Sequence, residues 1–200
     1  MRLFVSLEPP LDATQPVADA VAELGRVPGV RWSPPSRWHV TLAFLGELDD
    51  DDVRRLLPPL RSAAAATGPV RLRLAGTGTF GTSVLWAGVT GDVERLAALA
   101  AGVADAARAA GVAIEERAYR PHVTLARAAG RGGAGALGQL ADQLADQLIG
   151  ARGPTWTATG ARLVRSHTSD GRYEVLEHLP LVADAPWSRR GRGGQRPRDR

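Results

Sequence analysis

Cysteine, lysine and long apolar runs are all missing from this 200-residue chain. Without cysteine the protein can form no disulfide and has no thiolate to act as nucleophile or metal ligand, which fits a reducing cytoplasm. No run of 18 or more apolar residues occurs, so we expect no membrane span. The apolar run at residues 2–7 meets Glu8-Pro9-Pro10 too early to serve as the core of a signal peptide. We therefore expect a soluble, cytoplasmic protein.

All 25 basic residues are arginines, and six of them lie in residues 183–200. Those residues also include two Asp, so this tail carries the whole formal charge of +4, and residues 1–182 are electrically balanced. The pI of about 10.7 therefore reflects the tail. The tail has too little apolar content to fold alone, so we expect it to be disordered, with at most a non-specific attraction for RNA. Residues 1–182 are expected to form a single bilobal domain.

A tetrapeptide, His-Val-Thr-Leu, occurs twice, at residues 39–42 and 122–125. Each copy lies in a run whose apolar residues alternate with a period of two, which predicts a half-buried strand. On a strand, two residues separated by one other point to the same face. Each copy should therefore present an imidazole and a hydroxyl together. The two remaining histidines, His167 and His178, lack this context and are interpreted as surface residues.

Periodicity along the chain predicts an α+β fold built from a duplicated half. Helices are expected at residues 14–27, 49–60, 92–110 and 137–149, and strands at 2–8, 39–45, 70–75, 84–89, 122–125, 156–166 and 173–181. Pro58-Pro59 should kink or shorten the second helix, and residues 76–83 should form a loop or bulge. Related by a pseudo-twofold axis, the halves would form two lobes, each an antiparallel sheet with helices on its outer face. A central cleft between the lobes would hold the two imidazoles on opposite walls.

Two histidines across a cleft are suited to general acid–base catalysis near neutral pH, because their ordinary pKa is about 6.5. The threonine hydroxyls beside them would add hydrogen-bond donors for an anion such as a phosphoryl group. The acidic residues nearest the motifs, Glu47 and Glu115-Glu116, lie outside the His-Thr faces. Two histidines alone make a poor ligand set, so we expect no metal and no cofactor. The Gly-rich stretch at residues 130–135 lacks the residue order of a phosphate-binding P-loop and is interpreted as a flexible connection.

The paired motifs resemble those of the 2H phosphoesterase superfamily, and in more detail the RNA 2',3'-cyclic phosphodiesterases, also called 2'-5' RNA ligases. One His-x-Thr motif is weak support, but two with these flanks are specific. The resemblance covers nearly all of residues 1–182. It is carried by residues 1–5, 39–46, 80–81, 84–89, 120–127, 163–166, and by Gly171, Tyr173 and Leu176.

The resemblance implies a metal-independent enzyme that opens a terminal 2',3'-cyclic phosphate on RNA to a 2'-phosphomonoester. The same site could join such an end to a 5'-hydroxyl by the reverse chemistry. It implies that His122 activates water as proton acceptor and that His39 protonates the departing 3'-oxygen as proton donor. It also implies that Thr41, Thr124 and Arg127 bind the phosphate. RNA with a 2',3'-cyclic phosphate terminus, or a cyclic nucleotide, is the expected partner of a monomeric protein.

Several alternatives remain open at this point. The two copies are too alike for the sequence to decide which histidine is the base. The substrate could be a different small cyclic phosphate or nucleotide, or the chain could bind RNA ends with negligible turnover. Arg127 could be a surface cation at a strand end. Trp38 and Tyr119 could stack a base, or could pack in the core or at its rim.

Overall fold

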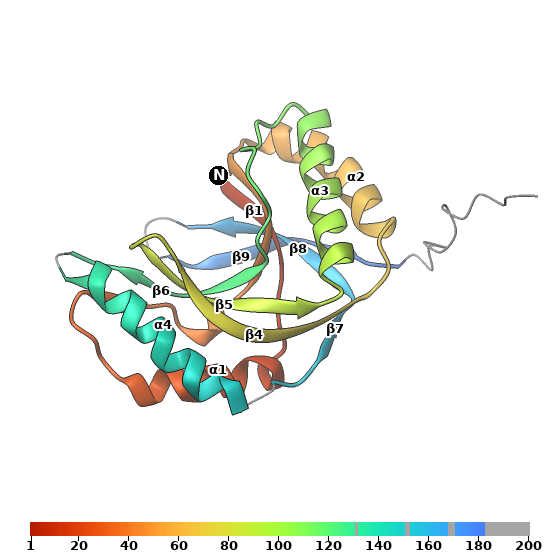
Figure 1. Cartoon of the computed structure of the whole chain (residues 1–200). Coiled ribbons are helices and arrows are strands. Elements are labelled where there is room, and N and C mark those ends of the chain that lie inside the picture. Colours follow the sequence, from red (N-terminus) through yellow and green to blue (C-terminus); the bar gives the residue numbers. More distant parts are fainter. Residues whose placement is uncertain (131, 151–152, 168–170, 183–200) are drawn as a thin grey trace, which may run out of the picture.

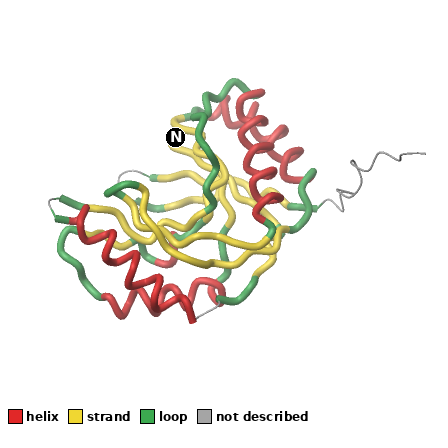
Figure 2. Tube along the Cα trace, in the orientation of Figure 1, coloured by secondary structure: helices red, strands yellow, loops and turns green. Residues whose placement is uncertain are grey.

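One curled antiparallel sheet with two pairs of α-helices packed on it forms the body of the computed structural model (Figures 1 and 2). Residues 1–130, 132–150, 153–167 and 171–182 are described, and the expected tail at residues 183–200 lies outside them. No helix within the described residues is long and apolar enough to cross a bilayer. The helices are α1 (Leu11–Leu24), α2 (Asp50–Ala65), α3 (Val93–Ala109) and α4 (Gly133–Gly150), with a short 3-10 turn, η1 (Pro35–Arg37). The strands are β1 (Arg2–Leu7), β2 (Val30–Trp32), β3 (Val40–Glu47), β4 (Val70–Phe80), β5 (Val84–Gly91), β6 (His122–Ala128), β7 (Trp156–Ala158), β8 (Gly160–Ser166) and β9 (Tyr173–Pro180).

Strand order divides the sheet into two lobes. The order is β7-β4-β5-β6-β3-β1-β8-β9, and β2 pairs with β6 outside this path. One residue pair, Val40 with Val123, links β3 to β6 at the centre. We call β3, β1, β8 and β9 the first lobe, and β6, β5, β4 and β7 the second lobe. The predicted α+β class with two lobes is confirmed, and the lobes are parts of one continuous sheet.

The helices pack as two pairs, one for each lobe. Helices α2 and α3 contact each other and the strands β9 and β3, whereas α1 and α4 contact each other and α4 lies on β4, β5 and β6. Figure 1 shows these pairs on opposite sides of the molecule. Helix α1 follows β1 of the first lobe but packs with the second, and α3 follows β5 of the second lobe but packs with the first. Each lobe is therefore assembled from both halves of the sequence.

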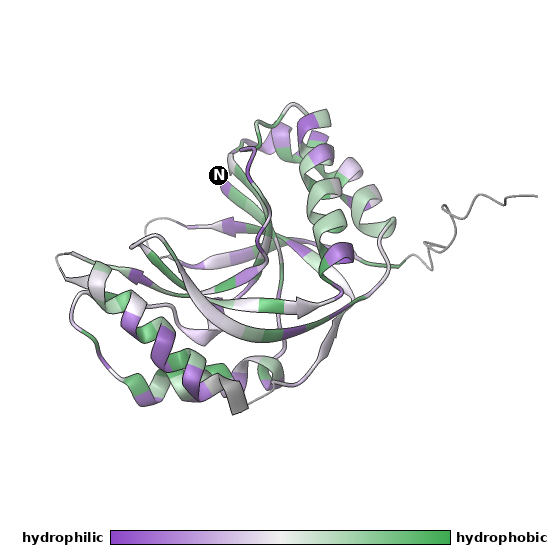
Figure 3. Ribbon diagram, in the orientation of Figure 1, coloured by the Kyte–Doolittle hydropathy of each residue, from purple (hydrophilic) through white to green (hydrophobic). Residues whose placement is uncertain are grey.

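Burial of apolar side chains between sheet and helices accounts for this packing. Leu3, Val5 and Leu7 of β1 alternate onto the helix-facing side and are at most 1% exposed. Leu56 of α2 and Leu99 of α3 are equally buried. Each such side chain contributes about 1.5–3 kcal/mol on burial. Figure 3 shows α3 coloured mainly in the hydrophobic half of the scale, as expected of a helix rich in alanine and leucine.

Of the two outcomes predicted for Pro58-Pro59, a kink or a shortening of the second helix, the shortening does not occur, because α2 continues through both prolines to Ala65. Its N-terminus is held by a capping box in which Asp49 and Asp52 each accept from the other's backbone N–H. Beyond the prolines, Leu60 and Ala64 are fully buried. This burial offsets the cost of the missing backbone donors, which is about 3 kcal/mol for a proline inside a helix.

Further elements differ from the sequence prediction. The single strand expected at residues 156–166 is two strands, β7 at the edge of the sheet beside β4 and β8 beside β1. Strand β4 extends to Phe80, and of the loop or bulge expected after residue 75 the structure has an irregularity in pairing between Leu74 and Thr77. Helix α4 begins at Gly133, inside the Gly-rich stretch. A Cβ at Gly133 would overlap the carbonyl group of Gly29. Glycine is needed here for close approach of two backbone segments, and not for flexibility.

Candidate active site

The two His-Val-Thr-Leu copies are neighbours at the junction of the lobes. Val40 and Val123 pair in an antiparallel register, and both are fully buried. Because alternate residues of a strand point to opposite faces, the residues on either side of these valines share the other face. The same register sets His39 across from Thr124 and Thr41 across from His122. The structure thus brings together the four predicted His and Thr residues, each half-buried.

Each histidine is oriented by a backbone carbonyl two residues before it. His39 Nδ1 lies 2.8 Å from the carbonyl oxygen of Arg37, and His122 Nδ1 lies 2.6 Å from that of Arg120. A carbonyl oxygen can only accept, so Nδ1 must carry the proton and donate it. The nitrogen left to exchange protons with a ligand is therefore Nε2 in both rings. The two imidazoles are held in the same tautomer.

A β-bulge in the second copy brings Arg127 to the His-Thr face. Two consecutive residues of β5 pair with Thr124 and Ala126, which leaves Leu125 as an extra residue. A bulge shifts the alternation of side chains by one position. Leu125 and Ala126 are both buried, and Arg127 then returns to the exposed face with His122. Without the bulge, Arg127 would point to the opposite side of the sheet.

The first copy has the same bulge at the same place. Consecutive residues of β1 pair with Thr41 and Ala43, leaving Leu42 as the extra residue. Two buried residues again precede an exposed one, which here is Phe44. Phe44 thus lies on the His39 face, at the position that Arg127 occupies in the other copy. The residue five places after each histidine is aromatic in the first lobe and cationic in the second.

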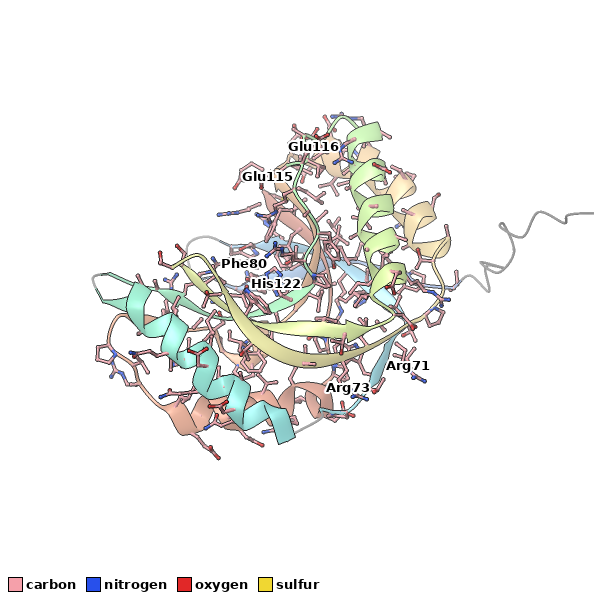
Figure 4. All side chains as sticks on the ribbon, viewed as in Figure 1. Arg71, Arg73, Phe80, Glu115, Glu116 and His122 are labelled. Atoms are coloured by element: carbon pink, nitrogen blue, oxygen red, sulfur yellow. The ribbon has the colours of Figure 1, made fainter. Side chains whose placement is uncertain are left out.

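Aromatic rings pack against both imidazoles, but differently. The Phe4 ring stacks on His39 with centroids 4.7 Å apart and planes 26° apart, and Tyr173 approaches the same imidazole edge-on at 5.5 Å. His122 has one aromatic neighbour of this kind, Phe80, which meets it edge-on at 4.7 Å. Figure 4 shows Phe80 and His122 side by side. His39 is therefore held between two rings and His122 against one.

Burial lowers the pKa of both histidines below the ordinary value of 6.5. The hydrogen bonds to Arg37 and Arg120 oppose this shift, while the positive charge of Arg127 lowers the pKa of each ring. Arg117 also lowers the pKa of His122. Both imidazoles are consequently neutral at pH 7. A bound anion would favour protonation of one of them, because an opposite charge stabilises the imidazolium.

No carboxylate joins the two histidines in the described part of the chain. Glu115 and Glu116 are exposed and lie midway along the segment that joins α3 to β6, away from His122 in Figure 4. Arg71 and Arg73 lie at the distant end of β4 (Figure 4). Among the described residues, no three His, Cys, Asp or Glu side chains gather as metal ligands. The charged group that acts on both imidazoles is Arg127.

Core packing or a hydrogen-bond partner occupies three of the other residues singled out in the sequence, Trp38, Tyr119 and His167. Trp38 is 3% exposed and donates its Nε1–H to the carbonyl of Ser33 at 2.9 Å, so it packs in the core. Tyr119 packs against the core, and burial raises the pKa of its hydroxyl. His167 Nε2 lies 2.8 Å from Glu174 Oε2. His178 is exposed on β9.

Sequence reasoning missed the aromatic residues of the site. Phe4 and Tyr173 are far from the motifs in the chain, and only strand pairing brings them to His39. Phe44 had a detectable signal, because it differs from Arg127 at the same position of two otherwise identical repeats. A second signal is the Leu-Ala pair in each copy, whose two consecutive apolar residues interrupt the alternation expected of a regular strand.

Comparisons with known proteins show the family to which the chain is similar. The sequence profile of the family described as the 2'-5' RNA ligase superfamily matches residues 9–170. The chain is 29% identical over 207 residues to an RNA 2',3'-cyclic phosphodiesterase of Thermus thermophilus, and the match covers 98% of each chain. It is 34% identical over 100 residues to a protein of the same name from Geobacillus stearothermophilus. That match covers 48% of this chain and 32% of the relative.

Solved structures have the same fold. The crystal structure of the Thermus thermophilus protein TT0787 superposes with a TM-score of 0.69 at 27% identity, covering 92% of this chain and all of that one. The structure of E. coli LigT complexed with 3'-AMP gives the same TM-score at 22% identity, covering 91% of this chain and 98% of LigT. At that identity the likeness to LigT concerns the fold alone.

Proposed function

The chain belongs to the 2'-5' RNA ligase superfamily, and from this premise we propose that it is a metal-independent RNA 2',3'-cyclic phosphodiesterase. Its substrate is the 2',3'-cyclic phosphate at the end of an RNA, and its product is a 2'-phosphomonoester with a free 3'-hydroxyl. The names of the relatives from Thermus thermophilus and Geobacillus stearothermophilus support this choice.

The observation that carries the proposal is the pair of imidazoles presented in one tautomer on one face. Both Nδ1–H groups are tied to carbonyl oxygens, so both Nε2 atoms are available to the same ligand. Thr41 and Thr124 stand beside them, and Arg127 lies on the same face. Two proton-exchanging groups with a cation and two hydroxyls match the needs of in-line displacement at phosphorus.

In the proposed step, His122 Nε2 takes a proton from water as its oxygen attacks the phosphorus atom. The P–O3' bond breaks on the opposite side, and His39 Nε2–H gives its proton to the departing 3'-oxygen. His39 must be protonated beforehand, which the negative phosphate favours. The positive charge of Arg117 supports the neutral form of His122 that a base needs. Thr41, Thr124 and Arg127 bind the non-bridging oxygens.

The same constellation accounts for ligation. If a 5'-hydroxyl of a second RNA replaces water, His122 takes its proton and the P–O3' bond breaks as before. The product is then a 2'-5' phosphodiester. The reaction exchanges one phosphoester bond for another and needs no nucleotide cofactor.

A dinucleotide that ends in a 2',3'-cyclic phosphate tests the proposal. We expect the purified protein to release only the 2'-phosphate isomer, resolved from the 3' isomer by 31P NMR, at a rate that a chelator such as EDTA leaves unchanged. Formation of the 3' isomer would exclude the assignment of the leaving oxygen. If the protein retains the dinucleotide for hours at high protein concentration and forms no product, the result would favour an RNA-end binding protein over an enzyme.

A further inference from the structure

An exposed apolar strip on the first lobe lies beside His39. It consists of Phe44, Tyr173 and Val175, whose exposed fractions are 48%, 38% and 40%. We infer that this strip binds the bases of single-stranded RNA that precede the terminal cyclic phosphate, so that oligonucleotides are preferred over mononucleotides. The inference rests on the proposed function and adds to it a path for the RNA.

Strand register makes the strip continuous. Phe4 pairs with Phe44 on one side and with Val164 on the other, and Val164 pairs with Val175. The Phe4 ring is 6.2 Å from Phe44 and 5.2 Å from Tyr173, centroid to centroid. Phe4 and Val164 are buried and support the exposed residues from below. The strip therefore runs from the imidazole of His39 across four strands to β9, the edge of the sheet.

Exposed large apolar residues are concentrated at this place. Within the described residues, the others with comparable exposure are Leu11 and Val182. Single exposed apolar side chains are ordinary, but several in one patch next to a reactive site indicate a binding surface. The second lobe has no equivalent in the part of it that is described, since Phe80 and Trp86 are half-buried and pack on each other with centroids 5.5 Å apart.

Two guanidinium groups distinguish this strip from a surface for an apolar peptide. Arg117 lies over the Phe44 ring at 5.9 Å from its centroid, and Arg37 lies over the Tyr173 ring at 5.3 Å. Aromatic rings interleaved with arginines suit single-stranded nucleic acid, because bases stack and phosphates pair with the cations. Glu115 lies 3.8 Å from Arg117, but both side chains are largely exposed, so this pair is weak.

Phe44 and Arg127 occupy matching positions of the two repeats but differ in chemistry, and this difference sets the direction in which the RNA leaves the site. Arg127 brings positive charge to the second-lobe side of the histidine pair, where the phosphate is bound. Phe44 brings an aromatic ring to the first-lobe side at the same position of the repeat. The sugar and bases therefore leave the site over the first lobe, and the strip lies directly along that path.

A series of substrates of increasing length tests the strip. We expect kcat/KM to be about tenfold higher for a trinucleotide ending in a 2',3'-cyclic phosphate than for the 2',3'-cyclic mononucleotide with the same base. The double variant Phe44→Ser/Val175→Ser should lose this preference, reducing the ratio to about one. Tyr173 is left intact, because its ring also contacts His39. Leu11→Ser, at a residue 74% exposed and outside the strip, is the matched control and should keep the wild-type ratio.

Binding measurements separate failure of the strip from failure of the proposed function. Fluorescence anisotropy with a labelled trinucleotide carrying a 2'-phosphate reports affinity without turnover, and the double variant should bind about tenfold more weakly than wild type. Loss of turnover on every substrate would refute the proposed function, while this measurement would still test the strip. Equal affinity of variant and wild type would overturn the strip, as would a change in oligomeric state without a change in RNA binding. If the double variant fails to fold by circular dichroism, Val175→Ser alone takes its place, with the same expected direction.

Discussion

The two His-Val-Thr-Leu copies have the same backbone and different surroundings. Both histidines donate Nδ1–H to the carbonyl two residues earlier, and both strands bulge directly after threonine. His39, however, lies between Phe4 and Tyr173, whereas His122 has Phe80 on one side and the charge of Arg117 nearby. The repeated motif thus orients the two imidazoles alike, and the neighbouring strands make their environments unequal.

That difference indicates how a symmetric frame can bind an asymmetric substrate. A cyclic phosphate at an RNA end has a charged side and a side that carries sugar and bases. The second lobe offers Arg127, and the first lobe offers Phe44 at the matching position. In the proposed function, equal histidines with unequal flanks fix which way the substrate lies, and with it which imidazole meets the leaving oxygen.

The largest expected effect comes from removing either imidazole. His39→Ala and His122→Ala should each lower kcat on a cyclic-phosphate dinucleotide by roughly 10²–10⁴-fold, the usual contribution of a general acid or base. A nitrophenyl phosphodiester releases nitrophenolate, which leaves without a proton from a general acid. On such a substrate His39→Ala should recover activity while His122→Ala should not. The reverse pattern would exchange the two roles, and full activity of either variant on the dinucleotide would refute the two-histidine mechanism.

Removing the positive charge of Arg127 is expected to have the second-largest effect on activity. Arg127→Gln should lower kcat/KM by about 10²-fold, since it removes a charged donor to the phosphate. Because Arg127 lowers the pKa of both histidines, the acidic limb of the pH–rate profile should move to higher pH in this variant. Arg71→Gln, at the far end of β4 (Figure 4), is the control. An unshifted profile would mean that Arg127 does not act on the imidazoles.

The rings that pack on the histidines should differ in their contribution to stability. Phe4→Leu should lower the free energy of unfolding by about 1 kcal/mol, because this buried ring contacts His39, Phe44 and Tyr173. Phe80→Leu should cost less, since Phe80 is only half-buried. Urea denaturation of both variants measures the difference. Equal losses would show that the two histidine environments are energetically alike.

The smallest effect is the pH dependence of stability. The folded-state pKa of both histidines lies below the unfolded value of about 6.5, so the unfolded chain binds more protons as the pH falls past that value. Stability is therefore lost as the pH falls below about 6.5. His39→Phe, which removes one of these groups, should show a smaller fall in Tm over this range than wild type. His178→Gln, at an exposed histidine, should show the wild-type fall.

Much of the site could be predicted because its signals are local. The repeated tetrapeptide, its alternation and the arginine after the second copy are all visible within short windows. Elements with strong periodicity, such as α3 and β5, lie close to their predicted bounds. The helix through Pro58-Pro59 could not be predicted, because the burial that stabilises it depends on packing with another helix.

Local sequence is enough to predict that two imidazoles and two hydroxyls lie on strand faces, since side-chain alternation is a property of the strand alone. Tertiary structure decided what surrounds them. Only pairing with β5 and β1 creates the bulges that bring Arg127 and Phe44 to the site, and only the sheet brings Phe4 and Tyr173 to His39. The exchange of α1 and α3 between lobes is likewise non-local. The reason is that register and helix docking depend on which apolar surfaces meet, and those surfaces are far apart in the chain.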